Sequence, residues 1–245
     1  MIACIIPARY DSSRFPGKPL ADLLGKPMIQ HVYERVRLSP RVEMVAVATD
    51  DKRIHDRVIA FGGKAVMTAS YHRSGSDRVA EAAKILGLAD EDIVVNVQGD
   101  QPLFNPEQIT EVVSPLLRDS RLYMTTLIYP IAREEEVTHP HAVKTVCDRE
   151  GFALYFSRST IPFVREKGKK ARYYKHHGIY AYRVQFLHTF STLPDGTLEM
   201  LESLEQLRVL EYGYRIKCIV SAYDSVEVDS PEELARVKEM LLGEK

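Results

Sequence analysis

The first hundred residues alternate between short apolar runs and segments with helical periodicity, and this alternation restricts the folds open to the chain. The apolar runs span 1–8, 42–50, 64–69 and 92–100, and the helical segments span 26–38, 51–63 and 76–87. Strands that are apolar throughout are typical of a parallel sheet covered by helices on both faces. The pattern predicts an α/β protein with a doubly wound, mostly parallel sheet.

The pattern changes between residues 122 and 182. Strand-like runs follow one another at 122–130, 142–148, 152–159 and 176–182, with few helical patterns between them. We expect 122–182 to form a smaller antiparallel lobe within a single domain of residues 1–245, where it extends the sheet or forms a dimer surface. The basic segment 165–175 is expected to be a solvated loop.

The remaining residues return to the α/β pattern. Residues 198–213 predict one helix whose leucines at 201, 204, 207 and 210 form a stripe, and 215–223 predicts a strand. A final helix is expected after Ser230, because Ser230 and Glu233 match a capping box with Pro231 at the first helical position.

Charge and composition exclude several classes of protein. The chain has 33 basic and 34 acidic residues, a balance that argues against a nucleic-acid-binding protein. No apolar run approaches the roughly 18 residues of a membrane span, and no signal-peptide pattern opens the chain. Cys4, Cys147 and Cys218 are scattered without metal-ligand spacing, which fits buried thiols in a reducing cytoplasm.

The segment IIPARYDSSRFPGKPL, residues 5–20, is the first candidate site. It places Arg9, Arg14 and Lys18 in a proline-stiffened loop after the first strand. Ligands of open α/β sheets bind beyond the carboxyl ends of the strands, so the loop is well placed to wrap phosphates. An ordinary solvated surface loop is an equally good reading of the composition. The spacing matches neither a dinucleotide-binding fingerprint nor a P-loop.

Two aspartates also follow predicted strands. Asp100 ends the run VVNVQGD, and Asp229 ends the run VEVD. Carboxylates in such positions can hold Mg²⁺ against nucleotide phosphates. The alternatives are a turn-forming role for Asp100 and a helix-capping role for Asp229, which Ser230 fills better.

Several longer segments, taken together, resemble the 3-deoxy-manno-octulosonate (Kdo) cytidylyltransferase family, the CMP-Kdo synthetases. Besides residues 5–20, the matching segments are HRSGSDR (72–78), VVNVQGDQP (94–102), ALYFSRSTIPF (153–163), KHHGIYAY (175–182), LESLEQLRVLEYG (201–213) and VEVDSPEEL (226–234). The likeness spans nearly the whole chain. It implies a nucleotidyltransferase fold, CTP and a Kdo-type sugar acid as substrates, a homodimer, and a role in lipopolysaccharide biosynthesis in the cytoplasm.

The resemblance also implies roles for individual residues. Asp100 and Asp229 would bind Mg²⁺, and Asp100, Lys18 and Arg9 would act in catalysis. The residues implied for CTP are Arg9, Lys18, Ser74, Gly75, Arg78, Gln98 and Asp100, and those implied for the sugar acid are Arg14, Gln98, Gln101, His176, Tyr180, Glu205 and Gln206. Taken singly, His176 could equally be a strand-end histidine, and Glu205 and Gln206 the polar flank of a helix.

The sequence departs from the commonest family pattern at two positions. Gln101 stands where a glutamate is expected, and Arg73 stands where a glutamine is expected. A branch of the family that activates 8-amino-3,8-dideoxy-manno-octulosonate shares the segments SRFPGKPL and QGDQPL, so this sugar is an alternative substrate. Two further alternatives are another sugar nucleotidyltransferase, such as a CMP-sialate synthetase, and a nucleotide-binding module without turnover.

Overall fold

The first hundred residues fold into alternating strands and helices, as the apolar pattern predicts. The computed structural model describes residues 1–11, 15–166 and 168–243. The early elements are β1 (Ile2–Ala8), α1 (Met28–Arg37), β4 (Met44–Thr49), α2 (Lys52–Ala60), β5 (Ala65–Met67), α3 (Gly75–Ile85) and β6 (Ile93–Asn96). Between β1 and α1 the chain adds a short 3₁₀ helix, η1 (Lys18–Leu20), and a two-stranded ribbon of β2 (Asp22–Leu23) and β3 (Lys26–Pro27).

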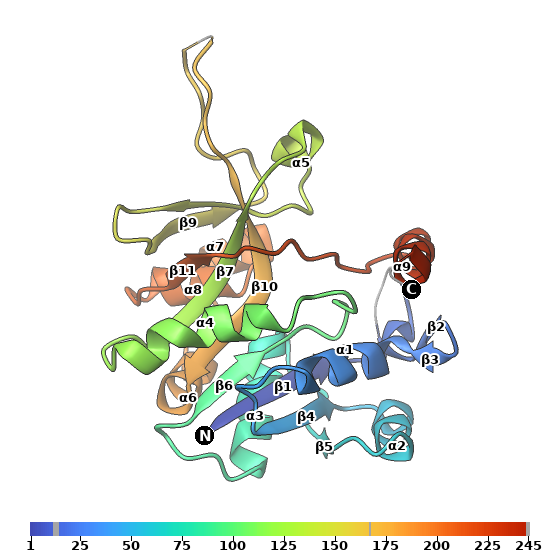
Figure 1. Cartoon of the computed structure of the whole chain (residues 1–245). Helices are drawn as coiled ribbons and strands as arrows, with labels where there is room; N and C mark the ends of the chain where they lie inside the picture. Colours follow the sequence, from blue (N-terminus) through green and yellow to red (C-terminus); the bar gives the residue numbers. More distant parts are fainter. Residues whose placement is uncertain (12–14, 167, 244–245) are drawn as a thin grey trace.

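The later elements mix short helices with antiparallel strands. They are α4 (Glu107–Arg118), β7 (Met124–Pro130), α5 (Glu134–Thr138), β8 (Lys144–Cys147), β9 (Ala153–Ser157), β10 (Tyr174–Arg183), α6 (Val184–Thr192), α7 (Thr197–Glu202), α8 (Gln206–Glu211), β11 (Lys217–Val220) and α9 (Pro231–Gly243). Figure 1 shows that α9 lies beside the ribbon of β2 and β3, far from β11, which precedes it in the chain.

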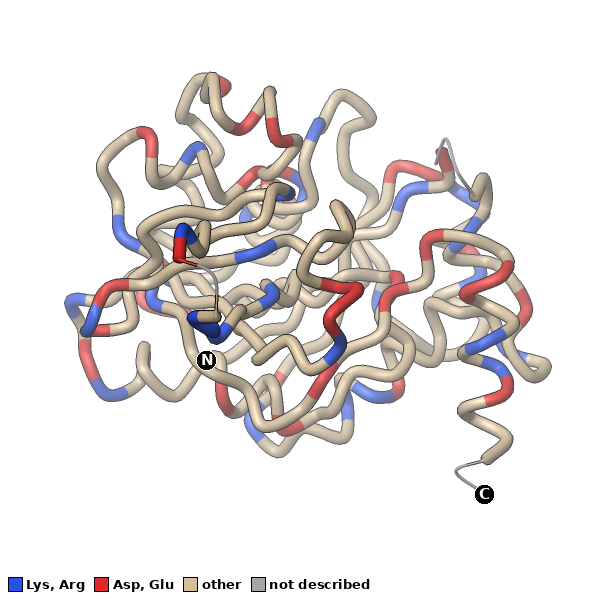
Figure 2. Tube along the Cα trace, turned by 90° about the horizontal axis from the view of Figure 1, so that it is seen from above, with Lys and Arg blue, Asp and Glu red and all other residues tan. Residues whose placement is uncertain are grey.

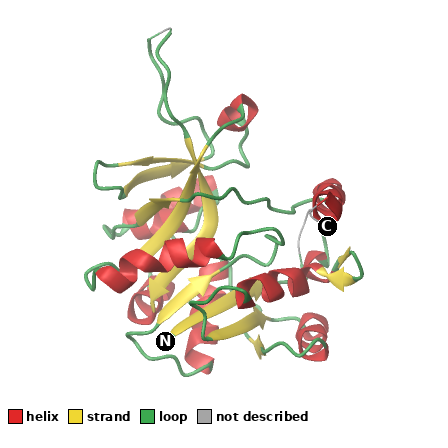
Figure 3. Cartoon of the chain, viewed as in Figure 1, coloured by secondary structure: helices red, strands yellow, loops and turns green. Residues whose placement is uncertain are grey.

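Nine strands within the described residues form one large sheet with helices around it (Figure 3). Its main path runs β11-β7-β10-β6-β1-β4-β5, and neighbouring strands are parallel except on the two sides of β10. In the parallel part, β1 pairs with β4 and β6, so Ile6 lies opposite Val47 and Cys4 lies opposite Val95. The predicted α/β class with a mostly parallel sheet is confirmed.

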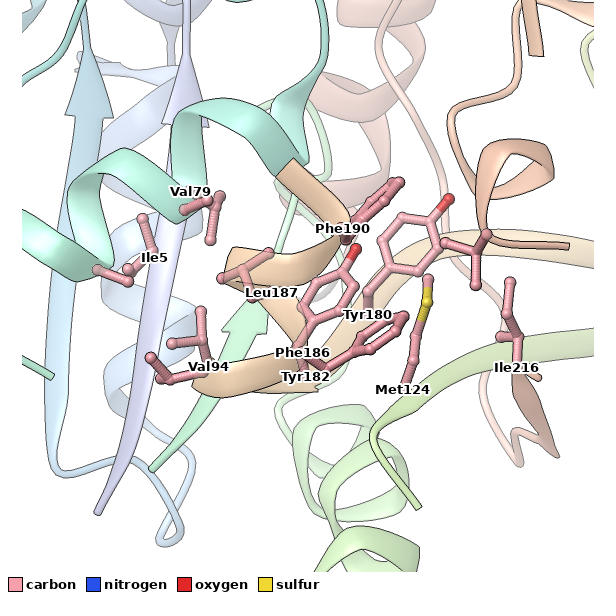
Figure 4. Packing of buried hydrophobic residues seen from close by; sticks show 14 of the residues in the cluster. Ile5, Val79, Val94, Met124, Tyr180, Tyr182, Phe186, Leu187, Phe190 and Ile216 are labelled. Atoms are coloured by element: carbon pink, nitrogen blue, oxygen red, sulfur yellow. The ribbon is translucent and has the colours of Figure 1, made fainter. Parts of the chain in front are cut away.

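The hydrophobic core has two layers because both faces of the sheet are covered. Alternate residues of β1 enter different layers: Ile5 packs with Val79 of α3, while Ile6 packs with Ile29 of α1. Successive strand side chains point to opposite faces, so a strand covered on both faces has to be apolar throughout. Figure 4 shows the first layer continuing toward Tyr182 of β10, whose ring stacks on Phe190 of α6.

Segment 122–182 contributes in two ways to the sheet. β7 and β10 are inner strands of the main path, whereas β8 and β9 form a hairpin that joins the sheet through the pairing of β8 with β10. The described residues between β9 and β10 project away from the body (Figure 1). Arg165, Lys169, Lys170 and Arg172 are exposed as expected, but Lys175 is buried and pairs with Glu136 and Asp224.

Two helical predictions need correction. The single helix expected over 198–213 is divided into α7 and α8 at Ser203, which adopts the left-handed conformation with φ of 52°. The leucine stripe is broken with it, because Leu201 is 78% exposed while Leu207 is fully buried. α6 was not expected, because its sequence VQFLHTFST is rich in aromatic and β-branched residues that have no strong helix preference.

Residues 221–230, here called the crossover strap, join β11 to α9. The strap runs across the molecule from the sheet to the far side (Figure 1). Val228 fixes it, since its side chain is buried with Leu23, Met28 and Val237 and its amide donates to the carbonyl of Asp100 at 2.9 Å. The expected capping box is confirmed: the amide of Glu233 donates to Ser230 Oγ, and the Glu233 carboxylate accepts from the amide of Ser230.

Basic and acidic residues are interspersed over the surface, and no face carries one sign alone in the view of Figure 2. Across residues 1–11, 15–166 and 168–243, the helices are all too short or too polar to cross a membrane.

Candidate active site

A cavity of about 240 Å³ lies where the parallel strands β1 and β6 end. This is the edge at which open α/β sheets bind ligands. Four segments that are far apart in sequence line it. The lining residues are Pro7, Ala8, Arg9, Lys18, Pro19, His72, Arg73, Ser74, Gly75, Arg78, Gln98, Gly99, Asp100 and Asp229. All seven residues that the sequence assigns to CTP are among them.

Lys18 and the two predicted metal-binding aspartates meet in this cavity. Lys18 Nζ lies 2.7 Å from Asp100 Oδ2 and 3.1 Å from Asp229 Oδ1. Burial alone would lower the pKa of Lys18, but the charges and hydrogen bonds of Asp100 and then Asp229 outweigh it, so the pKa is raised. The ammonium is therefore held in its charged form between two carboxylates.

The same pair of carboxylates can be tested as a magnesium site. No group of three or more histidine, cysteine or acidic side chains in the described part of the chain has the arrangement of a metal centre. Mg²⁺ in nucleotide enzymes, however, needs only one or two protein carboxylates, because phosphates and waters complete its coordination. Asp100 and Asp229 already converge on one cation, the Lys18 ammonium. Their chemistry and placement fit Mg²⁺ bound together with a nucleotide.

The opening loop folds back on itself before it reaches Lys18. Gly17 has φ of 73°, its amide donates to the carbonyl of Tyr10 at 2.9 Å, and a Cβ there would lie 3.1 Å from the Tyr10 ring. Glycine is therefore required for both conformation and space. Arg9 is exposed and lines the cavity. Arg14, predicted to contact the sugar acid, lies outside the described residues.

The start of α3 forms the opposite wall of the cavity. Ser74 caps this helix, because its Oγ accepts from the amide of Asp77 at 3.1 Å. A Cβ on Gly75 would lie 3.4 Å from both the Gln98 amide oxygen and the Pro7 ring, so a glycine keeps this approach open. Arg78 is buried and already pairs with Asp50 at 3.1 Å.

Gln98 and Gln101 connect the cavity with β10. Gln98 Nε2 donates to Asn96 Oδ1 at 3.2 Å. Gln101 is fully buried and its Nε2 donates to Glu227 Oε1 at 3.0 Å, while its Oε1 has no hydrogen-bond partner among the described residues. A Cβ on Gly178 would lie 3.3 Å from Gln98 Cγ, 3.7 Å from Gln101 Nε2 and 3.8 Å from Glu227 Oε1. Side chains of two segments, the loop after β6 and the crossover strap, thus converge on a residue of β10 that has none.

Glu227 was missed by the sequence reasoning. Although the residue as a whole is exposed, its carboxyl group is closely surrounded by protein. This desolvation is the main cause that raises the pKa of Glu227 to about 7, and the negative charge of Asp100 is the second cause. Only its position two residues before Asp229 in a matching segment could have drawn attention to it. Its hydrogen-bond partner Gln101 is 126 residues away in sequence.

Besides Gln101, four residues predicted to bind the sugar do not line the cavity, and these four form a second cluster nearby. Tyr180 donates to Gln206 Oε1 at 3.1 Å, and Gln206 Nε2 has no partner among the described residues. His176 Nε2 lies 2.9 Å from Thr126 Oγ1, and burial followed by the charge of His177 lowers its pKa to about 3. His176 is thus a neutral hydrogen-bonding group at ordinary pH.

Glu205, the fourth of these residues, is held by a serine that the sequence reasoning also missed. Ser76 Oγ donates to Glu205 Oε1 at 2.6 Å and the Ser76 amide donates to Oε2 at 3.2 Å. Burial raises the pKa of Glu205, and the Ser76 bonds oppose this rise. Asn96 Nδ2 also donates to Ser76 Oγ, at 3.5 Å, so a polar chain links Glu205 through Ser76 and Asn96 to Gln98 at the cavity.

Comparison with known proteins decides the family. A family model described as cytidylyltransferase matches residues 3–217. The chain belongs to the cytidylyltransferase family. The predicted resemblance and the predicted enzyme class, a CTP-dependent nucleotidyltransferase, are therefore confirmed.

Relatives of this cytidylyltransferase carry the names of two related sugars. It is 67% identical to a 3-deoxy-manno-octulosonate cytidylyltransferase of Syntrophus aciditrophicus, over 99% of this chain and 98% of that protein. It is 53% identical to an 8-amino-3,8-dideoxy-manno-octulosonate cytidylyltransferase of Shewanella amazonensis, over 98% of both chains. Among solved structures it is similar to CMP:2-keto-3-deoxy-manno-octonic acid synthetase complexed with CTP, with a TM-score of 0.93, 45% identity, and coverage of 100% of this chain and 99% of that one.

Proposed function

We propose that this cytidylyltransferase transfers CMP from CTP to 3-deoxy-manno-octulosonate, giving CMP-Kdo and pyrophosphate for lipopolysaccharide biosynthesis. The observation that carries the proposal is the meeting of Lys18, Asp100 and Asp229 at the carboxyl end of β1. The relative of 67% identity with this activity in its name, and the similar structure complexed with CTP, support it.

The phosphate-binding role follows from charge at the mouth of the cavity. Arg9 and Lys18 would contact the triphosphate and stabilise the departing pyrophosphate, since both line the cavity. Ser74 and Gly75 would approach the nucleotide where α3 begins, because helix N-termini favour anions. Arg78 and Gln98 complete the proposed CTP contacts. Since Arg78 is paired with Asp50, its contribution is chiefly to hold this wall in place.

Asp100 and Asp229 would hold Mg²⁺ when the nucleotide is bound. The ion would neutralise charge on the phosphates and favour ionisation of the attacking hydroxyl. Lys18, which now pairs with both carboxylates, would be freed to bind phosphate oxygens instead. These three side chains therefore exchange partners when substrates enter.

The reaction itself needs positioning rather than a protein nucleophile. The anomeric 2-hydroxyl oxygen of the sugar acid bonds to the α-phosphorus, the bond from that phosphorus to the pyrophosphate oxygen breaks, and the hydroxyl proton passes to solvent. Gln98, Gln101, His176, Tyr180, Glu205 and Gln206 are the described residues proposed to orient the sugar. Gln101 Oε1 and Gln206 Nε2 are buried and lack partners among the described residues, so a polyol could satisfy them.

A panel of sugar acids tests the proposal. Purified enzyme with CTP and Mg²⁺ should release pyrophosphate with Kdo, more slowly with 8-amino-3,8-dideoxy-manno-octulosonate, and not with sialic acid. Release with sialic acid alone would instead favour a CMP-sialate synthetase. CTP binding without pyrophosphate release under any sugar acid would favour a nucleotide-binding module without turnover.

Assembly and location complete the proposal. We expect a homodimer formed through the lobe of residues 122–182, where Leu154 and Phe163 are 62% and 84% exposed. Association of this lobe would remove these side chains from water. The cytoplasm is the expected location, because CTP is made there and because Cys4, Cys147 and Cys218 are free thiols.

A further inference from the structure

Two residues of the segment KHHGIYAY, Lys175 and His177, have no role in the proposed reaction. Both are buried on β10. Successive side chains of a strand point to opposite faces, so the two lie on the face opposite His176, which belongs to the second cluster of sugar residues. Both contact Asp224, which lies in the crossover strap.

The ammonium of Lys175 lies between two carboxylates. Its Nζ is 2.9 Å from Asp224 Oδ1, 3.0 Å from Asp224 Oδ2 and 2.9 Å from Glu136 Oε1 of α5. The side chains of Lys175 and Glu136 are only 10% and 14% exposed. Solvent therefore weakens these contacts less than those of an exposed ion pair, and Asp224 is held firmly against β10.

His177 adds a hydrogen bond whose direction is determined by Gln108. Gln108 Oε1 accepts from the amide of Asn105 at 3.0 Å, and its Nε2 lies 3.2 Å from His177 Nδ1. An amide nitrogen can only donate, so Nδ1 accepts and the ring proton is on Nε2. Nε2 lies 3.2 Å from Asp224 Oδ1 and donates to it. The neutral imidazole thus matches both of its partners.

α4 holds the same part of the strap through two further contacts. Gln108 Nε2 donates to the carbonyl of Tyr223 at 3.2 Å, and Ser221 Oγ donates to Glu111 Oε2 at 2.6 Å. The name strap anchor is used below for Gln108, Lys175, His177 and Asp224. These four described residues are not among those that line the nucleotide cavity, so a nucleotide there leaves their contacts intact.

The other end of the strap carries Asp229, the proposed metal ligand. Asp229 Oδ1 lies 3.1 Å from Lys18 Nζ, and the amide of the preceding residue, Val228, donates to the carbonyl of Asp100. The proposed function moves Lys18 to the phosphates, so Asp229 loses this contact when substrates enter. Contacts that the substrates do not displace then have to keep the strap in place, and the strap anchor supplies them.

We propose that the strap anchor is a positioning device for Asp229: by fixing Asp224 to β10, it keeps the Asp229 carboxylate in place for a divalent cation bound with CTP after Lys18 has changed partners. This inference rests on the proposed function, in which Asp229 binds Mg²⁺. Gln108, Lys175 and His177 are positioning residues and touch neither the substrates nor the cation. Because His176 lies on the other face of β10, one strand aligns the metal ligand with the proposed sugar cluster.

The test measures how much Mg²⁺ strengthens CTP binding in Asp224→Ala and in the wild-type enzyme. Calorimetry with CTP and no sugar acid, with and without Mg²⁺, gives this gain in affinity without turnover. We expect the gain to be about tenfold smaller in the variant, the lower end of the effect of residues that orient metal ligands. The affinity for CTP without Mg²⁺ should change little. Asp56→Ala, which removes an exposed acid of α2 paired with Lys52, is the matched control.

Hydrogen exchange of the strap amides is the second readout. Exchange in residues 221–230 should be faster in Asp224→Ala, while the strands of the parallel sheet keep their protection. Faster exchange with an unchanged gain from Mg²⁺ would overturn the proposal, because the anchor would then be structural only. Equal weakening of CTP binding with and without Mg²⁺ would overturn it as well.

Two further controls keep the two proposals distinguishable. If Mg²⁺ gives no gain in the wild-type enzyme, the metal role of Asp229 and this inference both fail, and release of pyrophosphate with Kdo shows whether the proposed reaction survives. If thermal melting shows that Asp224→Ala is unfolded, Asp224→Asn takes its place, because it keeps the shape and one acceptor oxygen while it removes the charge. The same criteria then apply, with a smaller reduction of the gain expected.

Discussion

The proposed nucleotide side and the proposed sugar side of the site are built in different ways. On the nucleotide side, loops at the ends of parallel strands carry charged groups that pair with each other while partly exposed: Lys18, Asp100 and Asp229 keep 13%, 26% and 25% of their side-chain surfaces in contact with solvent. On the sugar side, Ser76, Tyr180 and Gln206 are buried in β10 and the helices beside it. The charged groups on the nucleotide side can exchange their partners for a ligand, whereas the polar groups on the sugar side are preorganised.

This difference predicts which property of the protein a substitution on each side should change. Partly exposed ion pairs contribute little to stability, so their loss should be seen in catalysis. Buried polar groups cost free energy when a partner is removed, so their loss should be seen in folding. The following substitutions test whether effects on catalysis and effects on folding are separated in this way.

The largest expected effect is on turnover. Asp100→Asn should lower kcat/KM for the sugar-dependent release of pyrophosphate by about 100-fold or more, the usual scale for one preorganised electrostatic group. The midpoint of thermal unfolding should change little. Steady-state kinetics at saturating Mg²⁺ and a melting curve measure both.

Asp119→Asn is the matched control, because Asp119 pairs with exposed Arg121 away from the cavity. Near-normal activity of Asp100→Asn would remove this residue from the proposed metal site. A large loss of stability would show that the two sides are not separated as described.

Ser76→Ala tests the preorganised side. It leaves the half-buried Glu205 carboxylate without its 2.6 Å hydrogen bond from Ser76 Oγ and removes the 2.8 Å contact with the hydroxyl of Tyr182. The free energy of unfolding should fall by about 1–3 kcal/mol, as measured by urea denaturation. Ser120→Ala at an exposed position should be neutral, and an equally neutral Ser76→Ala would contradict the view that this cluster is tightly built.

The last effect is a pH dependence on the sugar side, which should be small near neutral pH and grow as the pH falls. Because the folded pKa of His176 is about 3, below the ordinary value of 6.5, the unfolded chain binds more protons than the folded chain between these values. The contribution of His176 is thus fully present above pH 6.5 and is lost as pH falls toward 3, at up to about 1.4 kcal/mol per pH unit.

His176→Gln should flatten this part of the curve of unfolding free energy against pH. Denaturant titrations between pH 7 and pH 4.5 measure it, and His55→Gln, at a more exposed histidine of α2, is the control. Identical slopes for the wild type and His176→Gln would show that the pKa of His176 is not lowered in the folded protein as described.

Sequence reasoning succeeded where the determinants are local. The alternation of apolar strands and helices predicted the parallel part of the sheet, and Ser230 with Glu233 predicted the start of α9 to the residue. The division between α7 and α8 could not be predicted, because a left-handed serine is set by burial of Leu204 and Leu207 rather than by propensity.

The candidate site was predictable in part for the same reason. Strand ends indicated Asp100 and the opening loop. Asp229 was also expected at the end of a strand, which is wrong because residues 226–229 form no strand, so only the family resemblance indicated this residue. The partners of these residues depend on tertiary contacts, however. Nothing near Gln101 in sequence indicates Glu227, and nothing near Glu205 indicates Ser76, since each pair is separated by more than a hundred residues.

The crossover strap makes the order of synthesis matter. Asp229 follows every strand of the large sheet in the sequence, so every strand has already been synthesised before the second carboxylate exists. Until then Lys18 can find only Asp100, and the shelter that Val228 and Val237 give to Leu23 and Met28 is absent. A chain whose translation stops early would therefore present an open apolar surface beside half of the proposed metal site, a mark by which proteases could recognise it as unfinished.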